Sequence, residues 1–387
     1  MSKVRKAAMG LSRIDTHGHL VGEIPALESL AVSETAMDGI DRYYGNHMMA
    51  IGCRELYGID IGPMLTSVAP KQLFKKAAKL RAGGKQAALG EAFRKAKIET
   101  QFCFCNFRGA DADAKLAIAP HVRLLAYLDE AVLGSLPQGD NYIAGLEQVH
   151  GKLNSLDDLL ASIDRNIDAW RAKRVVGMKV SLAYYGHGLD LRNPTREQAV
   201  AAFARREKMT VEDRAFVRDF CTRHAFDACL RNKLPVVFHT GFLAFGNANI
   251  MGANPALLTP AFTDPRWEKL QFVILHGGYP YAGETGYLAS RYANVALDFT
   301  WISWMSPARF RQALAEWLAV VPLTRILWGA DSGTTPESIV GIDYVTRQIV
   351  ADVLEQQIAE GFIDEQRAIR FLELSYHENA RRIFRLT

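Results

Sequence analysis

The chain has 387 residues, of which 49% are hydrophobic and 23% are charged. This balance is typical of an ordinary globular protein, so extensive disorder is excluded. Lys and Arg number 46 against 42 Asp and Glu, and a formal charge of +4 is too weak to favour nucleic acid or an anionic membrane as a partner. No apolar run approaches the roughly 18 residues that a membrane-spanning helix needs, which excludes an integral membrane protein.

Cysteine usage and the start of the chain indicate the compartment. The five cysteines form no disulfide framework, and their odd number favours free thiols in a reducing cytoplasm. Basic residues open the chain, but Ser12, Arg13 and Asp15 interrupt any apolar stretch behind them, so we expect no signal peptide. The sequence therefore predicts a cytoplasmic protein.

Short apolar runs alternate with helical periodicity along the chain. The runs do not alternate with polar residues, which is typical of parallel strands buried on both faces. They are Ser12–His19, Gln101–Phe107, Val122–Leu128, Val175–Leu182, Pro235–Thr240, Phe272–His276, Val295–Thr300 and Ile326–Asp331. This order predicts a single α/β domain over residues 1–387 with a (β/α)8 (TIM) barrel fold, and a doubly wound sheet is the alternative. Polar residues at the ends of many runs favour the barrel, in which those ends meet on one face.

The stretch between the first two runs is too long for one loop and one helix. We therefore expect a helical insertion over residues 20–100. It follows the first strand at the face where barrel enzymes carry their active sites, which favours a cap that determines substrate specificity. The alternative is a peripheral helical layer.

Histidines and a carboxylate stand where four of the runs end. His17 and His19 end the first run and project from the same face of a strand, because strand side chains alternate with period two. His239, His276 and Asp331 end the fifth, sixth and eighth runs. One such histidine is most simply a satisfied polar group, but four strand ends that all offer metal ligands predict a metal centre.

These residues resemble the amidohydrolase superfamily of metal-dependent barrel enzymes. Leu275–Tyr281, Gly286–Ala289 and Leu297–Asp298 are similar to the amidohydrolase-2 group, and most of all to the amidohydrolase part of FluG-type proteins. Glu378–Phe384 resembles the closing helix of that group. The likeness spans nearly the whole chain and is weakest over residues 20–100.

The resemblance implies a ligand set. His17, His19 and His239 would bind metal, and Asp331 would bind it and also take a proton from water. In single-metal relatives the residue at the position of His276 polarises substrate or water, and in two-metal relatives it ligates the second ion. Lys179 stands where two-metal relatives carry a carboxylated lysine that bridges both ions, although single-metal relatives also have a lysine nearby. One or two Zn²⁺ ions are expected, and Mn²⁺ is an alternative.

The expected activity is hydrolysis of an amide or another C–N bond in a small, carboxylate-bearing molecule. Zinc makes water a nucleophile near neutral pH, and Asp331 would act as general base and acid beside it. A metal-dependent decarboxylase is the alternative, because some relatives use the same ligands for that reaction. A non-catalytic scaffold is a third hypothesis, which the complete ligand set disfavours.

Substrate contacts are harder to assign. Arg108 after the second strand is a candidate carboxylate ligand, and Tyr185, Tyr279 and Glu284 are further candidates. Trp301 and Trp304 are either the wall of an apolar pocket or part of the core. FluG-type relatives tend to carry an arginine in the segment that here is Tyr184–Leu189, so the position of the substrate anion is left open. A homodimer is the default expectation for such an enzyme.

Overall fold

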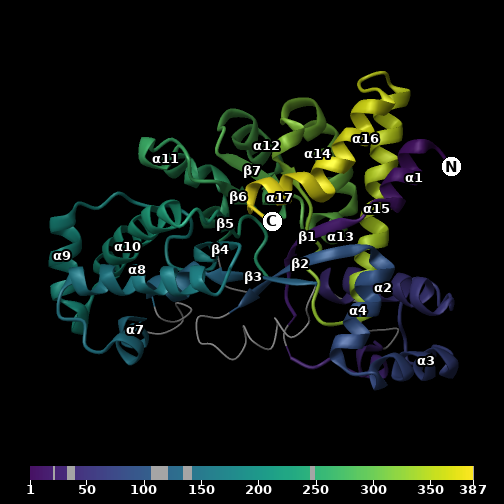
Figure 1. Ribbon diagram of the computed structural model, residues 1–387, viewed down its shortest axis with the longest axis horizontal. Helices are drawn as coiled ribbons and strands as arrows, with labels where there is room; N and C mark the ends of the chain where they lie inside the picture. Colours follow the sequence, from purple (N-terminus) through teal and green to yellow (C-terminus); the bar gives the residue numbers. More distant parts are fainter. Residues whose placement is uncertain (21, 33–39, 106–120, 134–141, 245–248, 387) are drawn as a thin grey trace. The chain divides into compact units, whose positions relative to one another are not determined.

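A computed structural model describes the chain except residues 21, 33–39, 106–120, 134–141, 245–248 and 387. The predicted runs form strands, shown as arrows in Figure 1. They are β1 (Arg13–Gly18), β2 (Ile98–Cys105), β3 (Val122–Tyr127), β4 (Gly177–Val180), β5 (Val236–Phe238), β6 (Phe272–Ile274), β7 (Val295–Asp298) and β8 (Ile326–Leu327). Every residue of β1, β4, β5, β6, β7 and β8 is buried, as the unalternating apolar pattern predicts.

The strands form one sheet in the order of the chain, β1 to β8. The residues that follow β8 then hydrogen-bond back to β1: the Thr16 N–H donates to the Trp328 carbonyl at 3.2 Å, and the Asp331 N–H donates to the His17 carbonyl at 2.9 Å. A sheet in sequential order whose last strand returns to its first is a (β/α)8 barrel. The predicted fold class is confirmed, and the doubly wound alternative is wrong because it would require the strand order to reverse.

The helices belong to two compact units of the chain. The first unit includes Met1–Cys103 and Phe299–Arg382, and the second includes Leu124–Asp298. The first contains α1 (Lys3–Gly10), α2 (Ile40–Tyr57), α3 (Lys71–Ala82), α4 (Lys85–Ala96), α13 (Ile302–Met305), α14 (Pro307–Val320), α15 (Pro336–Ala359) and α16 (Glu365–Glu373), and α17 (Asn379–Ile383) begins in it. The second contains α6 (Leu128–Leu133), α7 (Tyr142–His150), α8 (Leu156–Ala172), α9 (Arg196–Ala204), α10 (Val211–Arg231), α11 (Thr259–Phe262) and α12 (Ala282–Arg291).

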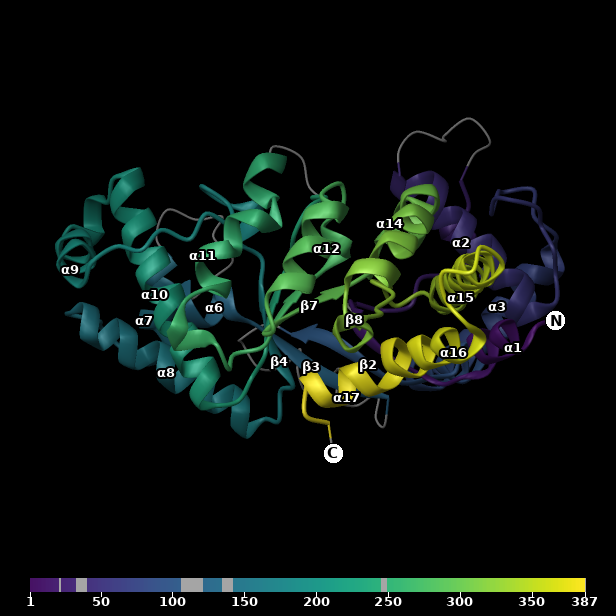
Figure 2. The same cartoon turned by 90° about the horizontal axis from the view of Figure 1, so that it is seen from above.

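The second unit is built around β3 to β7. Adjacent strands pair in register, with Val180 opposite Phe238, Phe238 opposite Ile274, and Ile274 opposite Leu297. Helices α8 and α10, which pack against each other, each begin with a capping box, at Ser155 and Thr210. Figure 2 shows these two helices in the part of the chain coloured teal. The aligned register puts the carboxyl ends of neighbouring strands at one level.

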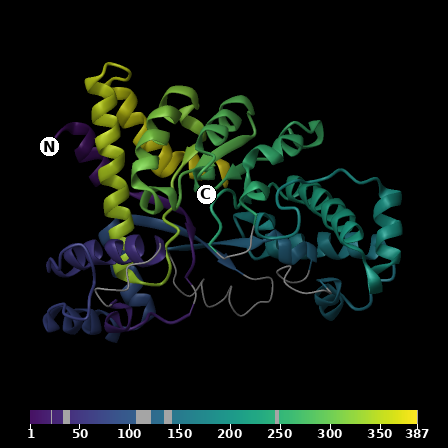
Figure 3. The same ribbon diagram turned by 180° about the vertical axis from the view of Figure 1, so that it is seen from behind.

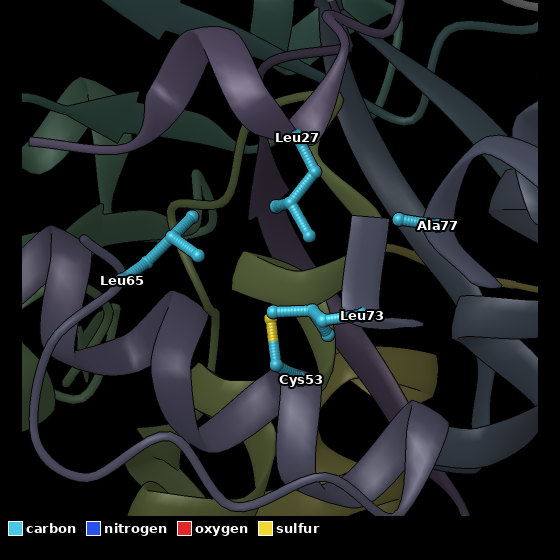
Figure 4. Packing of buried hydrophobic residues seen from close by; sticks show 5 residues of the cluster. All are labelled: Leu27, Cys53, Leu65, Leu73 and Ala77. Atoms are coloured by element: carbon cyan, nitrogen blue, oxygen red, sulfur yellow. The ribbon is translucent and has the colours of Figure 1, made fainter. Parts of the chain in front are cut away.

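The segment after β1 contains α2, α3 and α4 in sequence, joined by non-helical stretches, and β2 begins at Ile98, inside the last residues of the predicted insertion. It has a small hydrophobic core, formed by side chains spread between residues 27 and 77 (Figure 4). These are Leu27, Cys53, Leu65, Leu73 and Ala77. Its predicted function as a cap stays a prediction.

Helix α2 packs closely along α15 in the first unit, where Figure 3 shows α15 as a long helix. Two glycines permit the approach: a Cβ on Gly52 would lie 1.8 Å from the Glu337 carbonyl oxygen, and one on Gly341 would lie 1.8 Å from the Met48 carbonyl oxygen. The fully buried Glu337 carboxylate accepts two hydrogen bonds of 2.9 Å from Arg81 and one of 2.5 Å from the Tyr57 hydroxyl. The segment after β1 is therefore fixed to the helix after β8.

The structure bears on two predictions made from composition. All five cysteines are buried free thiols, as expected. Among the residues that the structure describes, no helix is both long enough and apolar enough to cross a membrane.

The glycine contact between α2 and α15 is testable with one pair of variants. Gly52→Ala should lower the free energy of unfolding by about 1–3 kcal/mol, because the added methyl group overlaps the Glu337 carbonyl. Gly90→Ala in α4 is the matched control, since nothing lies within 4 Å of its Cβ position, and it should raise stability by up to about 1 kcal/mol. Urea denaturation of both variants measures the two changes, and a Gly52→Ala protein as stable as Gly90→Ala would contradict the described packing.

Candidate metal centre

The end of β1 presents two histidines on one face. His17 is buried, the His19 side chain is 39% exposed, and their Nε2 atoms lie 3.2 Å apart. The residue between them has no room for a side chain, because a Cβ on Gly18 would lie 2.3 Å from the side-chain amide carbon of Gln101. The Thr-His-Gly-His sequence therefore suits both the strand alternation and the neighbouring strand.

Asp331 joins the two histidines from the segment after β8. Its Oδ1 lies 3.2 Å from the Nε2 of His17 and 3.2 Å from the Nε2 of His19. The three ligand atoms thus form a triangle with edges of 3.2 Å. A tetrahedral zinc site with bonds of about 2.0–2.1 Å has ligand-to-ligand edges of about 3.3–3.4 Å, so this donor set fits one face of such a site. Within the described part of the chain, these three residues are a group that could hold a metal ion.

The electrostatics of the triangle keep its carboxylate ionised. Burial by itself raises the pKa of Asp331, but the charges and hydrogen bonds of His17 and His19 outweigh burial and hold that pKa well below its ordinary value. A divalent cation requires the ionised carboxylate together with neutral imidazoles, so a bound cation would take the place of the protons on the two rings. The backbone of Asp331 is left-handed, with φ of 57°, a conformation that aspartate tolerates better than most residues.

A buried carboxylate, Asp15, lies behind the triangle. It accepts hydrogen bonds from the backbone N–H of Ala330 at 2.7 Å, the side chain of Gln101 at 2.7 Å and the backbone N–H of His17 at 3.2 Å. Burial raises the pKa of Asp15 to about 6, against the effect of these three hydrogen bonds. Its partners lie in or beside β1, β2 and β8.

In the second unit, His239 and His276 form a pair just beyond β5 and β6. The Nε2 of His276 lies 2.9 Å from the Nδ1 of His239, and the Nε2 of His239 lies 2.8 Å from the Phe242 carbonyl oxygen. A carbonyl only accepts, so in the neutral ring Nε2 of His239 carries the hydrogen and Nδ1 is an acceptor. Metal-ligating histidines commonly donate their outer N–H to a backbone carbonyl in this way. In the structure the other nitrogen of His239, Nδ1, faces Nε2 of His276, so the ligand role of His239 stays a prediction.

Lys179 is buried on β4 in surroundings that are partly apolar and partly acidic. Its Nζ lies 4.6 Å from the centroid of the Phe104 ring. Asp129 follows β3 and accepts a hydrogen bond of 2.6 Å from the Ser181 N–H. Burial raises the pKa of Asp129 to about 7, although the charges of Lys179 and Arg218 lower it. No described contact tests the predicted bridge at Lys179, which stays a prediction.

The predicted substrate contacts have different surroundings. Arg108 lies outside the described residues. The Tyr185 ring lies 6.1 Å from the Tyr184 ring, and Tyr279, which is half-buried, accepts a hydrogen bond on its carbonyl from the Phe242 N–H. Glu284 is exposed in the first turn of α12, where the helix dipole stabilises a negatively charged carboxylate.

Sequence patterns did not single out several residues beside these groups. The Tyr184 ring lies 4.5 Å from the His239 ring. Asp15 stands in the same motif as the histidines, two residues before His17, which was the available signal. Gln101 and Asp129 carry no local signal, because their contacts come from neighbouring strands and not from spacing along the chain.

Comparisons with known proteins identify the family of the chain. The family model described as amidohydrolase matches residues 155–386. Protein fluG of Emericella nidulans is 30% identical over 256 residues, which is 60% of this chain and 29% of that protein. The chain thus spans less than a third of the length of this relative.

Solved structures share the fold over the full length of the chain. A candidate metal-dependent hydrolase from Lactobacillus casei superimposes with a TM-score of 0.76 at 18% identity, covering 100% of this chain and 98% of that one. Uronate isomerase from Thermotoga maritima gives a TM-score of 0.76 at 13% identity, covering 99% and 96%. The resemblance inferred from the strand-end residues is confirmed: the chain belongs to the amidohydrolase family.

Proposed function

We propose that the chain is a metal-dependent hydrolase that uses activated water to cleave an amide or another C–N bond of a small, carboxylate-bearing substrate. The observation that carries the proposal is the triangle of His17, His19 and Asp331, whose 3.2 Å edges suit a divalent cation. Membership of the amidohydrolase family supports the same activity. Relatives of this fold include isomerases, so the reaction type rests on the site and not on the fold.

The donor set of two imidazoles and one carboxylate suits Zn²⁺, and Mn²⁺ is an alternative. His17, His19 and Asp331 would hold the ion, and the ligand roles of His239 and Lys179 belong to the proposal as predicted from the sequence. Whether one or two ions bind depends on Lys179. A bound Zn²⁺ would supply Lewis acidity, which makes water a nucleophile near neutral pH.

The chain's own residues would move the protons. The Asp331 carboxylate, whose Oδ1 lies 3.2 Å from the Nε2 atoms of His17 and His19, would be the general base that accepts a proton from the attacking water. The same group would then deliver that proton to the leaving nitrogen. His276 would polarise the substrate carbonyl, and Arg108, Tyr185, Tyr279 and Glu284 remain the proposed substrate contacts.

Metal content tests the ligand set. The purified protein should contain about one or two zinc or manganese ions per chain by plasma mass spectrometry, and His17→Ala should lose at least one of them, because it removes one of three ligand atoms. His377→Ala is the matched control, because His377 is far in sequence from His17 and His19 and its side chain contacts Glu99. Metal content that is the same in all three proteins would remove the basis of the proposal.

The proposed role of Asp331 as general base is tested by replacing its carboxylate with the amide of asparagine. Asp331→Asn protein that is folded and metal-loaded should hydrolyse N-acyl amino acids about 10²–10⁴-fold more slowly than wild type, because the general base is lost. Amine release from a panel of such substrates is the measurement, with CO₂ release followed in parallel. Full activity in the variant would contradict the assigned role, and release of CO₂ without amine would favour a decarboxylase.

A further inference from the structure

The backbone at Asp331 is held in a conformation that few residues adopt. Its φ of 57° lies in the left-handed region, which persists for a non-glycine residue where the surrounding structure fixes it. The orientation of the Asp331 carboxylate therefore depends on what holds the peptide groups on either side of this residue.

Both backbone polar groups of Ala330, the residue before Asp331, are bonded to buried side chains. The Ala330 N–H donates to Asp15 Oδ1 at 2.7 Å, and the Ala330 carbonyl accepts a hydrogen bond from Trp304 Nε1 at 2.9 Å. Asp15 is fully buried, and Trp304 is 8% exposed. Both partners come from segments far from Ala330 in the sequence, and neither belongs to the predicted ligand set.

Asp15 also connects Ala330 to the histidine strand. The same Oδ1 accepts the His17 N–H at 3.2 Å, and Oδ2 accepts Gln101 Nε2 at 2.7 Å. Gln101 Nε2 in turn donates to Ser332 Oγ at 3.0 Å. Hydrogen bonds from Asp15, directly or through Gln101, thus reach the residues immediately before and after Asp331.

We propose that Asp15 and Trp304 are positioning residues for the Asp331 carboxylate, and that they act by fixing the backbone N–H and the backbone carbonyl of Ala330. Neither side chain needs to touch the ion: their effect passes through the backbone to Oδ1 of Asp331, which forms one corner of the triangle. The inference rests on the metal centre proposed above and adds two residues to it. Side chains that orient metal ligands in this way typically contribute 10–100-fold to metal affinity.

The test measures Zn²⁺ affinity by competition with a chromophoric chelator, and the absorption spectrum of the Co²⁺-loaded protein, in five proteins. Asp15→Ala and Trp304→Phe should bind Zn²⁺ about 10–100-fold more weakly than wild type and show altered Co²⁺ bands. Asn46→Ala is the matched control, because it removes two buried hydrogen bonds to Leu65 in the same unit and should leave both readouts unchanged.

Asp15→Asn separates position from charge. The amide oxygen of the new side chain can still accept the hydrogen bonds from the backbone N–H groups of Ala330 and His17. Its NH₂ group can donate to Gln101 Oε1 once the Gln101 side-chain amide rotates by about 180°. This variant should therefore bind Zn²⁺ within about threefold of wild type, as expected if the hydrogen bonds matter more than the charge. If Asp15→Asn were as weak as Asp15→Ala, the charge of Asp15 would be responsible and the positioning role would be wrong.

The remaining outcomes are also decisive. Wild-type affinity and spectrum in Trp304→Phe and Asp15→Ala would overturn the inference, as would an equal loss in Asn46→Ala. If Asp15→Ala does not fold, Trp304→Phe and Asp15→Asn provide the test. Wild-type protein that takes up no Zn²⁺ would instead overturn the proposed metal centre itself, and that failure is distinguishable because it precedes any comparison of variants.

Discussion

The hydrogen bonds between β1 and the segment after β8 are the interactions on which the candidate metal centre depends. The Asp331 N–H donates to the His17 carbonyl at 2.9 Å, and the His19 N–H donates to the Ser332 carbonyl at 2.7 Å. These two bonds join residues more than 300 positions apart and place the carboxylate against both imidazoles. Closure of the sheet is therefore also the step that assembles the donor triangle.

The opposite end of the same strand pair is fixed by a buried cation. The Arg13 guanidinium lies 3.5 Å from the centroid of the Trp328 ring and 4.6 Å from that of Tyr376, and it forms an ion pair with Asp343. Burial holds the pKa of Arg13 well below its ordinary value. Such a charge is tolerated in a core only with close partners, which here are a carboxylate and two aromatic faces. Helix α15 supplies Asp343 and also carries Glu337, which binds the segment after β1.

Local patterns were sufficient to predict the strands and the donor triangle. The apolar runs have the length and composition of doubly buried strands, and period two already puts His17 and His19 on one face. The strand-end rule for barrels then brings in Asp331. Predictions of this kind work because each depends on a short segment and on a topology that the run order makes clear.

The groups that support the triangle could not be predicted in the same way. Asp15, Gln101 and Trp304 act through hydrogen bonds to strands distant in sequence, and such contacts depend on register that no local pattern records. The Tyr184 ring lies against the His239 ring because the chain enters a short 3₁₀ helix after β4, which no periodic pattern predicts. The substrate contacts proposed from loops stay predictions for the same reason, since loop conformation is not periodic.

The most direct measurement of the central claim is X-ray absorption at the zinc edge of the zinc-loaded protein. The account predicts a first shell of nitrogen and oxygen at about 2.0–2.1 Å, with the outer-shell scattering of at least two imidazole rings. An oxygen-only shell without imidazole, or sulfur at about 2.3 Å, would contradict a site formed by His17, His19 and Asp331.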